Sequence, residues 1–263
     1  MRKVFKFIII ISIFVFLTIT TQIGGLILLL SLFISAKWKT HFKFKNLTVF
    51  TTVYLLSTYI IIPVLAPMFG RQKIQTTNNL KPVTYMTVLL NRNYVKPQLN
   101  NVLQQISKNR QIRFLDANFP FINKFPLLPH LSHNDGNKID LSFIYEKQNG
   151  EITDLTKSTS GYGVFESPRK SEFDQISECK KLGYFQYDYP KYLTFGKKNS
   201  ELKFSETENK KLINEIVNNN LIEKVFIEPH LVKRLNLKND KIRYHGCRAV
   251  RHDDHIHIQI KNN

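Results

Sequence analysis

Histidines are concentrated in two short clusters that lie far apart in the chain. Five of the eight histidines fall in these clusters, and one carboxylate follows the first cluster closely: His130, His133, Asp140, His252, His255 and His257. Imidazoles and carboxylates bind Zn²⁺ in proteins, and three such ligands leave a position for water. The clusters therefore predict one Zn²⁺ per chain. The alternative is a polar loop surface rich in Asn and His.

The spacing of the second cluster is typical of a β-strand. Residues two apart point to the same face of a strand, so His255 and His257 project together from a strand over residues 255–260. Asp140 begins another expected strand, and His133 lies on the loop before it. If the two strands are neighbours, His133, Asp140 and one histidine of the final pair can meet around one cation. Spacing alone does not decide which of the pair is the ligand.

The pattern His130-x-x-His133-x6-Asp140, followed by His252-x-x-His255-x-His257, resembles the penicillin-insensitive murein endopeptidase family. That family is grouped with lysostaphin-type enzymes and D-alanyl-D-alanine carboxypeptidases among zinc peptidases. The resemblance covers roughly residues 114–260, includes a strand-then-helix segment at residues 222–233, and is thin across residues 148–199. The tryptophan-containing approach to the last motif of some members is replaced here by residues 244–247.

The resemblance implies roles for the individual residues. His133, Asp140 and His257 would bind Zn²⁺, and His255 would be the catalytic base or transition-state stabiliser. His130 and His252 would line the site and support catalysis. The implied reaction is hydrolysis of peptide cross-links in peptidoglycan by a metal-activated water, with peptide stems as the substrate. Asp253 or Asp254 can orient a neighbouring histidine through its ring N–H.

Three other functions remain compatible with the same residues. A D,D-carboxypeptidase or dipeptidase would need a cation for the substrate carboxylate, and the candidates are Arg243, Arg248 and Arg251. A non-catalytic wall scaffold would keep the zinc site without turnover. A zinc store or sensor would use a fourth protein ligand, His130 or His252, and leave no open position.

The first 70 residues predict an all-helical membrane anchor. Apolar runs occupy residues 4–20, 23–36 and 47–67, and about 17 to 25 apolar residues suffice for a spanning helix. We expect two spans and a third through the shorter middle run, with a tight turn at residues 20–25. A cleaved signal peptide is disfavoured because its apolar region should be shorter and no third run should follow.

Basic residues orient this anchor. Lys and Arg lie at the N-terminus and in residues 37–45, and the positive-inside rule places both groups in the cytoplasm. We therefore expect an inner-membrane protein whose catalytic domain lies on the periplasmic or extracellular side. The net charge is +18, but 15 of the 38 Lys and Arg and none of the 20 Asp and Glu lie in residues 1–115. The remainder has no dense basic stripe, which disfavours nucleic-acid binding. A basic region near a membrane suits the anionic headgroups of the lipid bilayer or an anionic wall polymer.

The expected fold is α+β, with a small, mostly antiparallel sheet carrying the zinc site after the membrane anchor. The domains are residues 1–70 for the anchor, 71–110 for a tether and entry helix, and 111–263 for the metallopeptidase domain. Expected helices cover residues 97–109, 172–181, 206–219 and 229–235, the third with a capping box from Ser205 to Glu208. Expected strands cover residues 84–90, 112–118, 140–147, 223–227 and 255–260, with a hairpin turn at 148–150. Cys179 and Cys247 form a disulfide or are two buried thiols, and the oligomeric state is left open.

Overall fold

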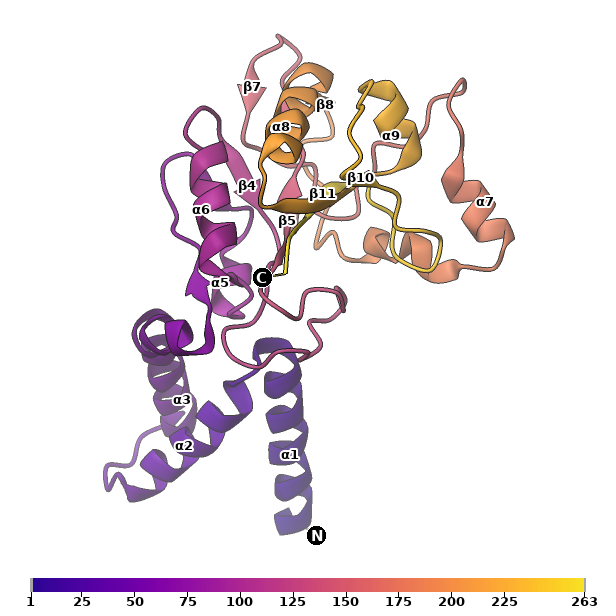
Figure 1. Ribbon diagram of the computed structural model, residues 1–263. Helices are drawn as coiled ribbons and strands as arrows, with labels where there is room; N and C mark the ends of the chain where they lie inside the picture. Colours follow the sequence, from indigo (N-terminus) through magenta and orange to yellow (C-terminus); the bar gives the residue numbers. More distant parts are fainter. Residues whose placement is uncertain (1, 263) are drawn as a thin grey trace. The chain divides into compact units, whose positions relative to one another are not determined.

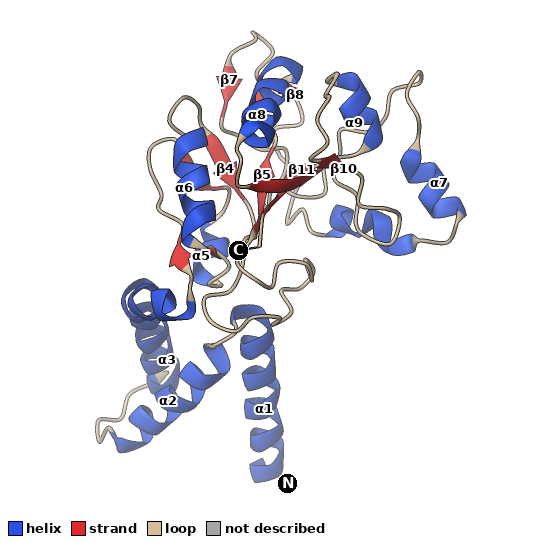
Figure 2. Ribbon diagram, viewed as in Figure 1, coloured by secondary structure: helices blue, strands red, loops and turns tan. Residues whose placement is uncertain are grey.

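The computed structural model describes residues 2–262 and has a mixed α/β fold (Figures 1 and 2). The chain forms two compact units, which are described separately. The first contains Met1–Ile74, Met86–Pro97 and Ala117–Gly136. The second contains Gln75–Tyr85, Gln98–Asp116 and Asn137–Asn263.

Helices make up most of the first unit. They are α1 (Arg2–Thr21), α2 (Gly24–Lys37) and α3 (Lys45–Leu56), with α3 continued by a π-helical turn η1 (Ser57–Ile61), α4 (Ile62–Leu65) and a 3₁₀ turn η2 (Ala66–Phe69). The π turn is a local widening of one long helix, a common irregularity. A short antiparallel pair, β1 (Gln72–Lys73) with β3 (Tyr94–Val95), follows the helices.

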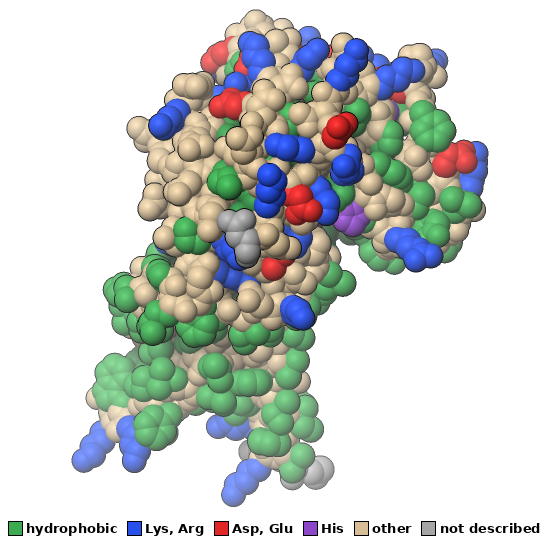
Figure 3. Space-filling model, in the orientation of Figure 1, with side chains coloured by type: hydrophobic (Ala, Val, Ile, Leu, Met, Phe, Trp, Pro, Cys, Tyr) green, Lys and Arg blue, Asp and Glu red, His purple; other side chains and the backbone are tan. Residues whose placement is uncertain are grey.

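Two helices are long and apolar enough to cross a bilayer by length and composition, Lys3–Thr21 and Lys45–Phe69. The apolar helix Gly24–Lys37 is shorter. Many large apolar side chains on α1, including Val4, Phe5 and Phe7, are exposed, which is the reverse of a buried core helix. Figure 3 shows hydrophobic side chains covering these helices and basic side chains at their far ends.

The first two apolar runs form separate helices that pack against each other. Gln22, with a positive φ of 69°, makes the turn between α1 and α2. Gly24 and Gly25 lie so close to α1 that an added Cβ would collide with Thr21 or Thr18. These glycines are therefore required for close helix packing.

A six-stranded sheet forms the centre of the second unit. Its order is β10 (Ile242–Arg243), β9 (Ile222–Phe226), β11 (His255–Ile260), β5 (Lys138–Ser142), β4 (Ile112–Phe114) and β2 (Leu80–Pro82). The pairs β10–β9 and β2–β4 are parallel, and the other pairs are antiparallel. The predicted small, mostly antiparallel sheet is confirmed.

Strand β11 alternates as its sequence predicts. Ile256 and Ile258 lie opposite Leu141 and Ile139 of β5, and all four side chains are fully buried. Such cross-strand apolar pairs stabilise a sheet and fix its register. A slip of one residue would turn both histidines of β11 away from their present face, so the isoleucines also position the histidines.

Helices α6 (Pro97–Ile106), α7 (Gln175–Lys181), α8 (Glu206–Asn218) and α9 (Pro229–Arg234) lie near the predicted positions, and a 3₁₀ helix η3 covers Phe185–Tyr192. A second sheet has the order β7 (Ile152–Thr153), β6 (Tyr145–Glu146) and β8 (Lys203–Phe204). The predicted hairpin turn joins β6 to β7, where Gly150 donates to Lys147.

Three local predictions were wrong. Residues 84–90 include a helix, α5 (Tyr85–Leu89), and Asn91, two residues after its end, lies in the left-handed region. The strand predicted over residues 140–147 is divided between β5 and β6, because the Asn209 side chain binds both the N–H and the C=O of Ile144 and replaces a strand partner there. Ser205 precedes α8 but makes no side-chain cap.

Candidate metal centre

The histidine strand lies directly beside the strand that carries Asp140. His257 is paired with Asp140 across the β11–β5 ladder, and His255 with Ser142. His257 Nδ1 lies 2.8 Å from Asp140 Oδ1, and His255 Nε2 lies 3.7 Å from the same oxygen. All three side chains are buried. The two strands are neighbours, which the sequence analysis had left as a condition, and both histidines approach one carboxylate.

Tyr162 holds the other oxygen of that carboxylate. Its hydroxyl donates to Asp140 Oδ2 at 2.8 Å and accepts from the Asp116 backbone N–H at 3.1 Å. Its ring packs edge-on against His255, with 5.1 Å between centroids. The sequence analysis missed Tyr162, which lies in a loop rich in Ser, Thr and Gly. A signal was present in the flanking Gly161 and Gly163, which both have positive φ.

Asp254 orients His255. Its Oδ1 lies 2.5 Å from His255 Nδ1, and its Oδ2 accepts the Gly163 backbone N–H at 2.6 Å. Burial alone would lower the pKa of His255, but the carboxylates of Asp140 and Asp254 outweigh it and raise that pKa to about 9. With Nδ1 held by Asp254, the other ring nitrogen faces Asp140.

The adjacent Asp253 has a different partner. It forms a buried bidentate ion pair with Arg251, whose third guanidinium nitrogen donates to Asp188 at 3.0 Å. The Arg251 guanidinium also lies 3.7 Å from the Phe165 ring centroid. The sequence left open whether Asp253 or Asp254 orients a neighbouring histidine. Asp254 contacts His255, whereas Asp253 belongs to an ion pair.

His252 lies next to the two strand histidines. Its ring centroid is 4.9 Å from that of His255 and 5.7 Å from that of His257. Burial, followed by the neighbouring histidines, holds the pKa of His252 well below its usual value, so this ring is neutral near pH 7. Its backbone N–H donates to Glu228 Oε1 at 2.9 Å, and Tyr187 donates to the other oxygen. Burial and Asp253 raise the pKa of Glu228 to about 7.

The first histidine cluster lies on the loop Ala117–Gly136. His133 Nδ1 lies 2.8 Å from the Ala117 carbonyl oxygen, and the backbone N–H of His133 donates to the backbone carbonyl of His130 at 2.9 Å. Because the carbonyl requires Nδ1 to be the protonated nitrogen, Nε2 of His133 carries the lone pair. A backbone carbonyl on one ring nitrogen is the usual support for a metal-binding histidine.

Three of the predicted residues form a possible metal-binding group. His130, His133 and Asp140 are buried, and each offers a ligand atom within 4.8 Å of the others. The family resemblance implies His133, Asp140 and His257 as ligands, with His130 lining the site and supporting catalysis. Here His130 joins the group, and His257 contacts Asp140 directly. Two imidazoles and a carboxylate, buried and without a competing cationic side chain in the group, fit a divalent metal ion.

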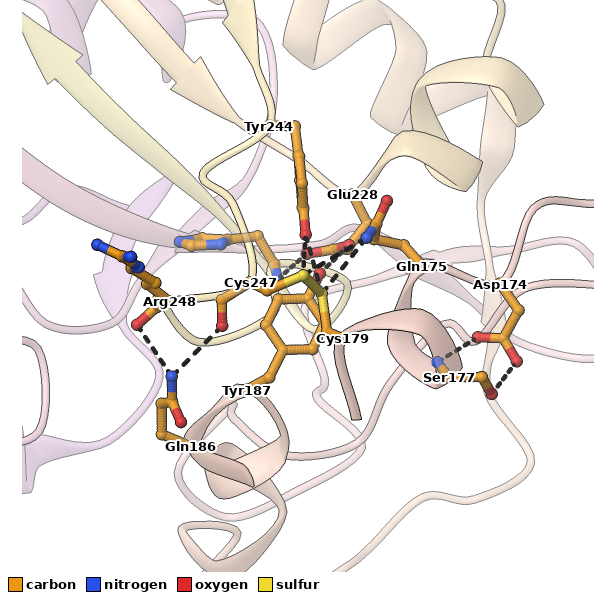
Figure 4. Close-up of a disulfide and its surroundings, with 11 residues drawn as sticks. Asp174, Gln175, Ser177, Cys179, Gln186, Tyr187, Glu228, Tyr244, Cys247 and Arg248 are labelled. Carbon is orange, nitrogen blue, oxygen red and sulfur yellow. Dashed lines mark hydrogen bonds between the residues drawn. A yellow bond between two sulfur atoms is a disulfide. The ribbon is translucent and has the colours of Figure 1, made fainter. Parts of the chain in front are cut away.

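The two cysteines of the chain form a disulfide. Cys179 on α7 is joined to Cys247, eight residues before β11 begins. Around it, Gln175 donates to Cys179 Sγ, and Gln186 donates to the carbonyls of Cys247 and Arg248 (Figure 4). The pairing that the sequence left open is therefore present. It ties the segment of α7 and η3 to the chain leading into the histidine strand.

Comparison with known proteins adds no relative to this description. No protein-family model matches the chain, and no curated protein matches it. The character of the site therefore follows from its own residues. The chemistry available is a metal-binding group, one histidine oriented by a carboxylate, and a buried aromatic hydroxyl that holds the shared aspartate.

Proposed function

We propose that the chain is a membrane-anchored zinc peptidase that hydrolyses peptide cross-links of peptidoglycan outside the cytoplasm. The proposal is supported by the buried group of His130, His133 and Asp140, by the contact of His257 with Asp140, and by a separately oriented histidine, His255. A site that only binds a metal ion needs no functional residues other than its ligands. An additional histidine held by its own carboxylate is the arrangement expected of a general base.

His133, Asp140 and His257 are the zinc ligands in this proposal. Bound Zn²⁺ would supply an acidified water and polarise the scissile carbonyl. His255 accepts a proton at Nε2, and Asp254 holds the opposite ring nitrogen and stabilises the imidazolium that forms. The charges of Asp140 and Asp254 both raise the pKa of His255 against the effect of burial. When the charge of Asp140 is engaged by a cation, its contribution falls and the imidazole becomes available as a base near neutral pH.

The arginines before the last motif bear on the choice between an endopeptidase and a carboxypeptidase. A carboxypeptidase must bind a free substrate carboxylate, commonly with a guanidinium. Arg251 is engaged with Asp253 and Asp188 and is buried, so it is not available for this task. Arg243 and Arg248 are exposed. An internal peptide bond needs no such partner.

The disulfide and the apolar helices support an external location. Disulfides persist in oxidising compartments and are rare in the cytoplasm. The basic residues 37–45 lie between α2 and α3, as expected for a cytoplasmic loop of a membrane anchor. An external catalytic domain beside the membrane has peptidoglycan as its nearest peptide polymer.

The test is to incubate the purified full chain with cross-linked muropeptides, with and without a chelator. We expect monomer release that stops with chelator and returns with Zn²⁺. His133→Ala and Asp140→Ala should lose bound zinc, and His255→Ala should keep zinc but lose turnover. Zinc loss in His255→Ala with zinc retention in His257→Ala would reverse the assignment of these two residues.

A zinc store or sensor is the second candidate, because His130 lies within the metal-binding group. If His130 and His257 both bind, the metal has four protein ligands and no position for water. X-ray absorption spectroscopy of the zinc-loaded chain separates the two functions. Three protein ligands and a water support the peptidase, whereas four protein ligands with no muropeptide cleavage support the store.

A further inference from the structure

We propose that the N-terminal helices are part of the metal centre, because they hold the loop that carries His130 and His133 through Gln22 and Arg71. The inference rests on the metal site of the proposed function, and it assigns the membrane anchor a positioning role. All the contacts that support it lie within the first compact unit.

Gln22 binds the histidine loop at the turn between α1 and α2. Its side-chain Oε1 accepts the backbone N–H groups of Phe121 at 2.9 Å and Ile122 at 3.3 Å, and its Nε2 donates to the Ile122 carbonyl at 3.3 Å. The residue is 3 % exposed. Burying an amide is costly unless it is hydrogen-bonded, and this amide uses both of its ends on the same stretch of loop.

Arg71, just after the long α3–η2 helix, clamps the loop on both sides of the histidines. Its guanidinium donates to the Phe119 carbonyl and the Asn123 side chain before them, and to the Asn134 carbonyl at 3.4 Å after them. The side chain is 1 % exposed. A planar guanidinium can bind several acceptors in a fixed geometry, which an ammonium cannot do.

An aromatic contact and a hydrogen bond at the base of the loop also support the histidine loop. Phe69 at the end of η2 packs edge-on against Phe121, with 5.0 Å between ring centroids. At the base of the loop, Gly136 N–H donates to Asn118 Oδ1 at 3.0 Å. The loop Ala117–Gly136 contains no helix or multi-residue strand among the described residues. A long loop without regular structure needs such external contacts to hold two ligands in place.

Gln22→Leu in the full chain tests the proposal, because leucine keeps the size and removes all three hydrogen bonds. We expect zinc affinity, measured by chelator competition, to fall roughly 10- to 100-fold, as for loss of a group that supports a metal ligand. Hydrogen exchange should accelerate over residues 117–136 and stay unchanged in β5 and β11. Arg71→Lys, which keeps the charge but not the planar geometry, should give the same pattern.

Thr20→Val is the matched control. It removes a polar group from the same turn, but the Thr20 hydroxyl bonds only the carbonyls of its own helix. It should leave zinc affinity and loop exchange unchanged. Unchanged zinc affinity in both Gln22→Leu and Arg71→Lys would overturn the proposal. Neither readout uses a peptide substrate, so the two proposals can fail separately. If the variants lose zinc as expected but the wild-type chain does not cleave muropeptides, only the proposed function is rejected.

A separate observation carries a second inference: we infer that the cavity at the α2–α3 loop binds the headgroup of an anionic phospholipid. The cavity measures about 930 Å³. Its lining includes Trp38, Lys39, His41, Phe42 and Lys45. Two contacts close the loop around it, Ser35 to Asn46 at 2.5 Å and Lys45 Nζ to the Trp38 carbonyl at 2.5 Å.

The charge and exposure of the lining residues indicate which kind of molecule occupies the cavity. Residues 1–115 contain no Asp or Glu, so nothing in this part of the sequence neutralises the cavity lysines. Trp38, Phe42 and Phe44 are large, exposed and beside these cations. Aromatic side chains mixed with lysines are typical of the membrane interface, and basic pockets between spanning helices on the cytoplasmic side bind anionic headgroups.

The test uses the full chain in uncharged detergent with phosphatidylglycerol, phosphatidylcholine or inorganic phosphate as probes, and native mass spectrometry as the measurement. We expect phosphatidylglycerol to bind preferentially. Lys39→Gln with Lys45→Gln should weaken it roughly 10- to 30-fold, as for loss of two lysines beside an anionic surface. Lys39→Gln alone, which leaves the Lys45–Trp38 contact intact, should give a smaller loss.

Lys37→Gln with Lys43→Gln is the control, because it removes the same charge from residues outside the cavity lining. It should retain the preference for phosphatidylglycerol. Equal losses in the two double variants would show general electrostatic attraction and overturn the site. Equal binding of both lipids, or complete displacement by millimolar inorganic phosphate, would also overturn the lipid assignment.

Discussion

Three aspartates near the histidine strand have different chemical tasks, because each has a different partner. Asp140 is approached by two histidines and a tyrosine hydroxyl. Asp254 binds one ring nitrogen of His255. Asp253 is neutralised by Arg251. Their order along the chain does not separate these tasks, since Asp253 and Asp254 are adjacent and their side chains point to different groups.

Tyr162→Phe tests the role of the hydroxyl on Asp140. The change removes the bond to Oδ2 while keeping the ring against His255, so we expect a 10- to 100-fold loss of metal affinity. Chelator competition on the full chain is the measurement. Tyr192→Phe, an exposed hydroxyl deletion, is the control. Wild-type affinity in Tyr162→Phe would show that the hydroxyl serves packing alone.

Asp254→Asn tests the orientation of His255. The amide keeps the size of the side chain but cannot stabilise an imidazolium, so we expect turnover to fall about 10- to 100-fold with zinc content unchanged. The pKa of His255, followed by NMR in the metal-free chain, should decrease because one of the two main carboxylates that raise it is neutralised. A substitution that left this pKa unchanged would contradict the assignment.

At the scale of elements, the strand order brings Asp140 next to His255 and His257 of the second cluster. β11 lies between β9 and β5, so the histidine strand has a hydrogen-bonded neighbour on each side. The loop before it is tied to α7 by the disulfide, and Glu228, just before α9, accepts the His252 N–H. The strand is therefore fixed on both sides and at its start, as a site on a rigid element requires.

A buried ion pair makes one of these elements sensitive to acid. Arg234 at the end of α9 donates two bonds to Glu172, and these bonds lower the pKa of Glu172 to about 2. A carboxylate with a depressed pKa stabilises the fold above its unfolded pKa of about 4.5, and this stability is lost as the pH falls toward 2.

Glu172→Gln should therefore destabilise the chain by about 2 kcal/mol at pH 7, a typical value for hydrogen bonds to a charged group. The difference from wild type should shrink below pH 4.5 and disappear near pH 2. Thermal unfolding across this range is the measurement. A difference that stays constant from pH 7 to pH 3 would show that the ionised carboxylate makes no contribution.

The elements that sequence predicted well are those with a local signal. The alternation of isoleucine and histidine in β11 predicted a strand with His255 and His257 on one face, whereas the pairing of that strand with the strand of Asp140 remained a condition. Helices α6 and α9 followed from apolar spacing or from proline at a first turn. Helix α8 was predicted from a capping box whose side-chain bond is not formed.

The features that sequence missed depend on contacts from distant residues. Nothing near Ile144 signals that Asn209, 65 residues later, takes over its backbone bonds and ends the strand. The Tyr162–Asp140 bond and the disulfide also depend on distant residues, because the residues they join lie 22 and 68 positions apart in the sequence. The support of the histidine loop by Gln22 was also unpredictable, since a glutamine beside an apolar run shows only where a helix can end.

At the scale of the whole molecule, the proposed orientation places the α2–α3 loop and the second unit on opposite sides of a membrane. Both native cysteines are joined in the disulfide, so an added cysteine reports on one position. We expect a membrane-impermeant maleimide to label Lys198→Cys in intact spheroplasts. Lys43→Cys should be labelled only after lysis. The opposite pattern would reverse the orientation.

The position of β11 in its sheet affects how the protein is made. This strand comes later in the chain than the other five strands of the sheet, yet it lies between two of them. During synthesis, β9 and β5 therefore keep their facing edges unpaired until this strand has been made. Asp140 and His257 meet only when this last strand inserts. Under the proposed function, a chain whose last strand is not yet in place lacks His257 as a ligand, and its zinc site can be completed only after synthesis has ended.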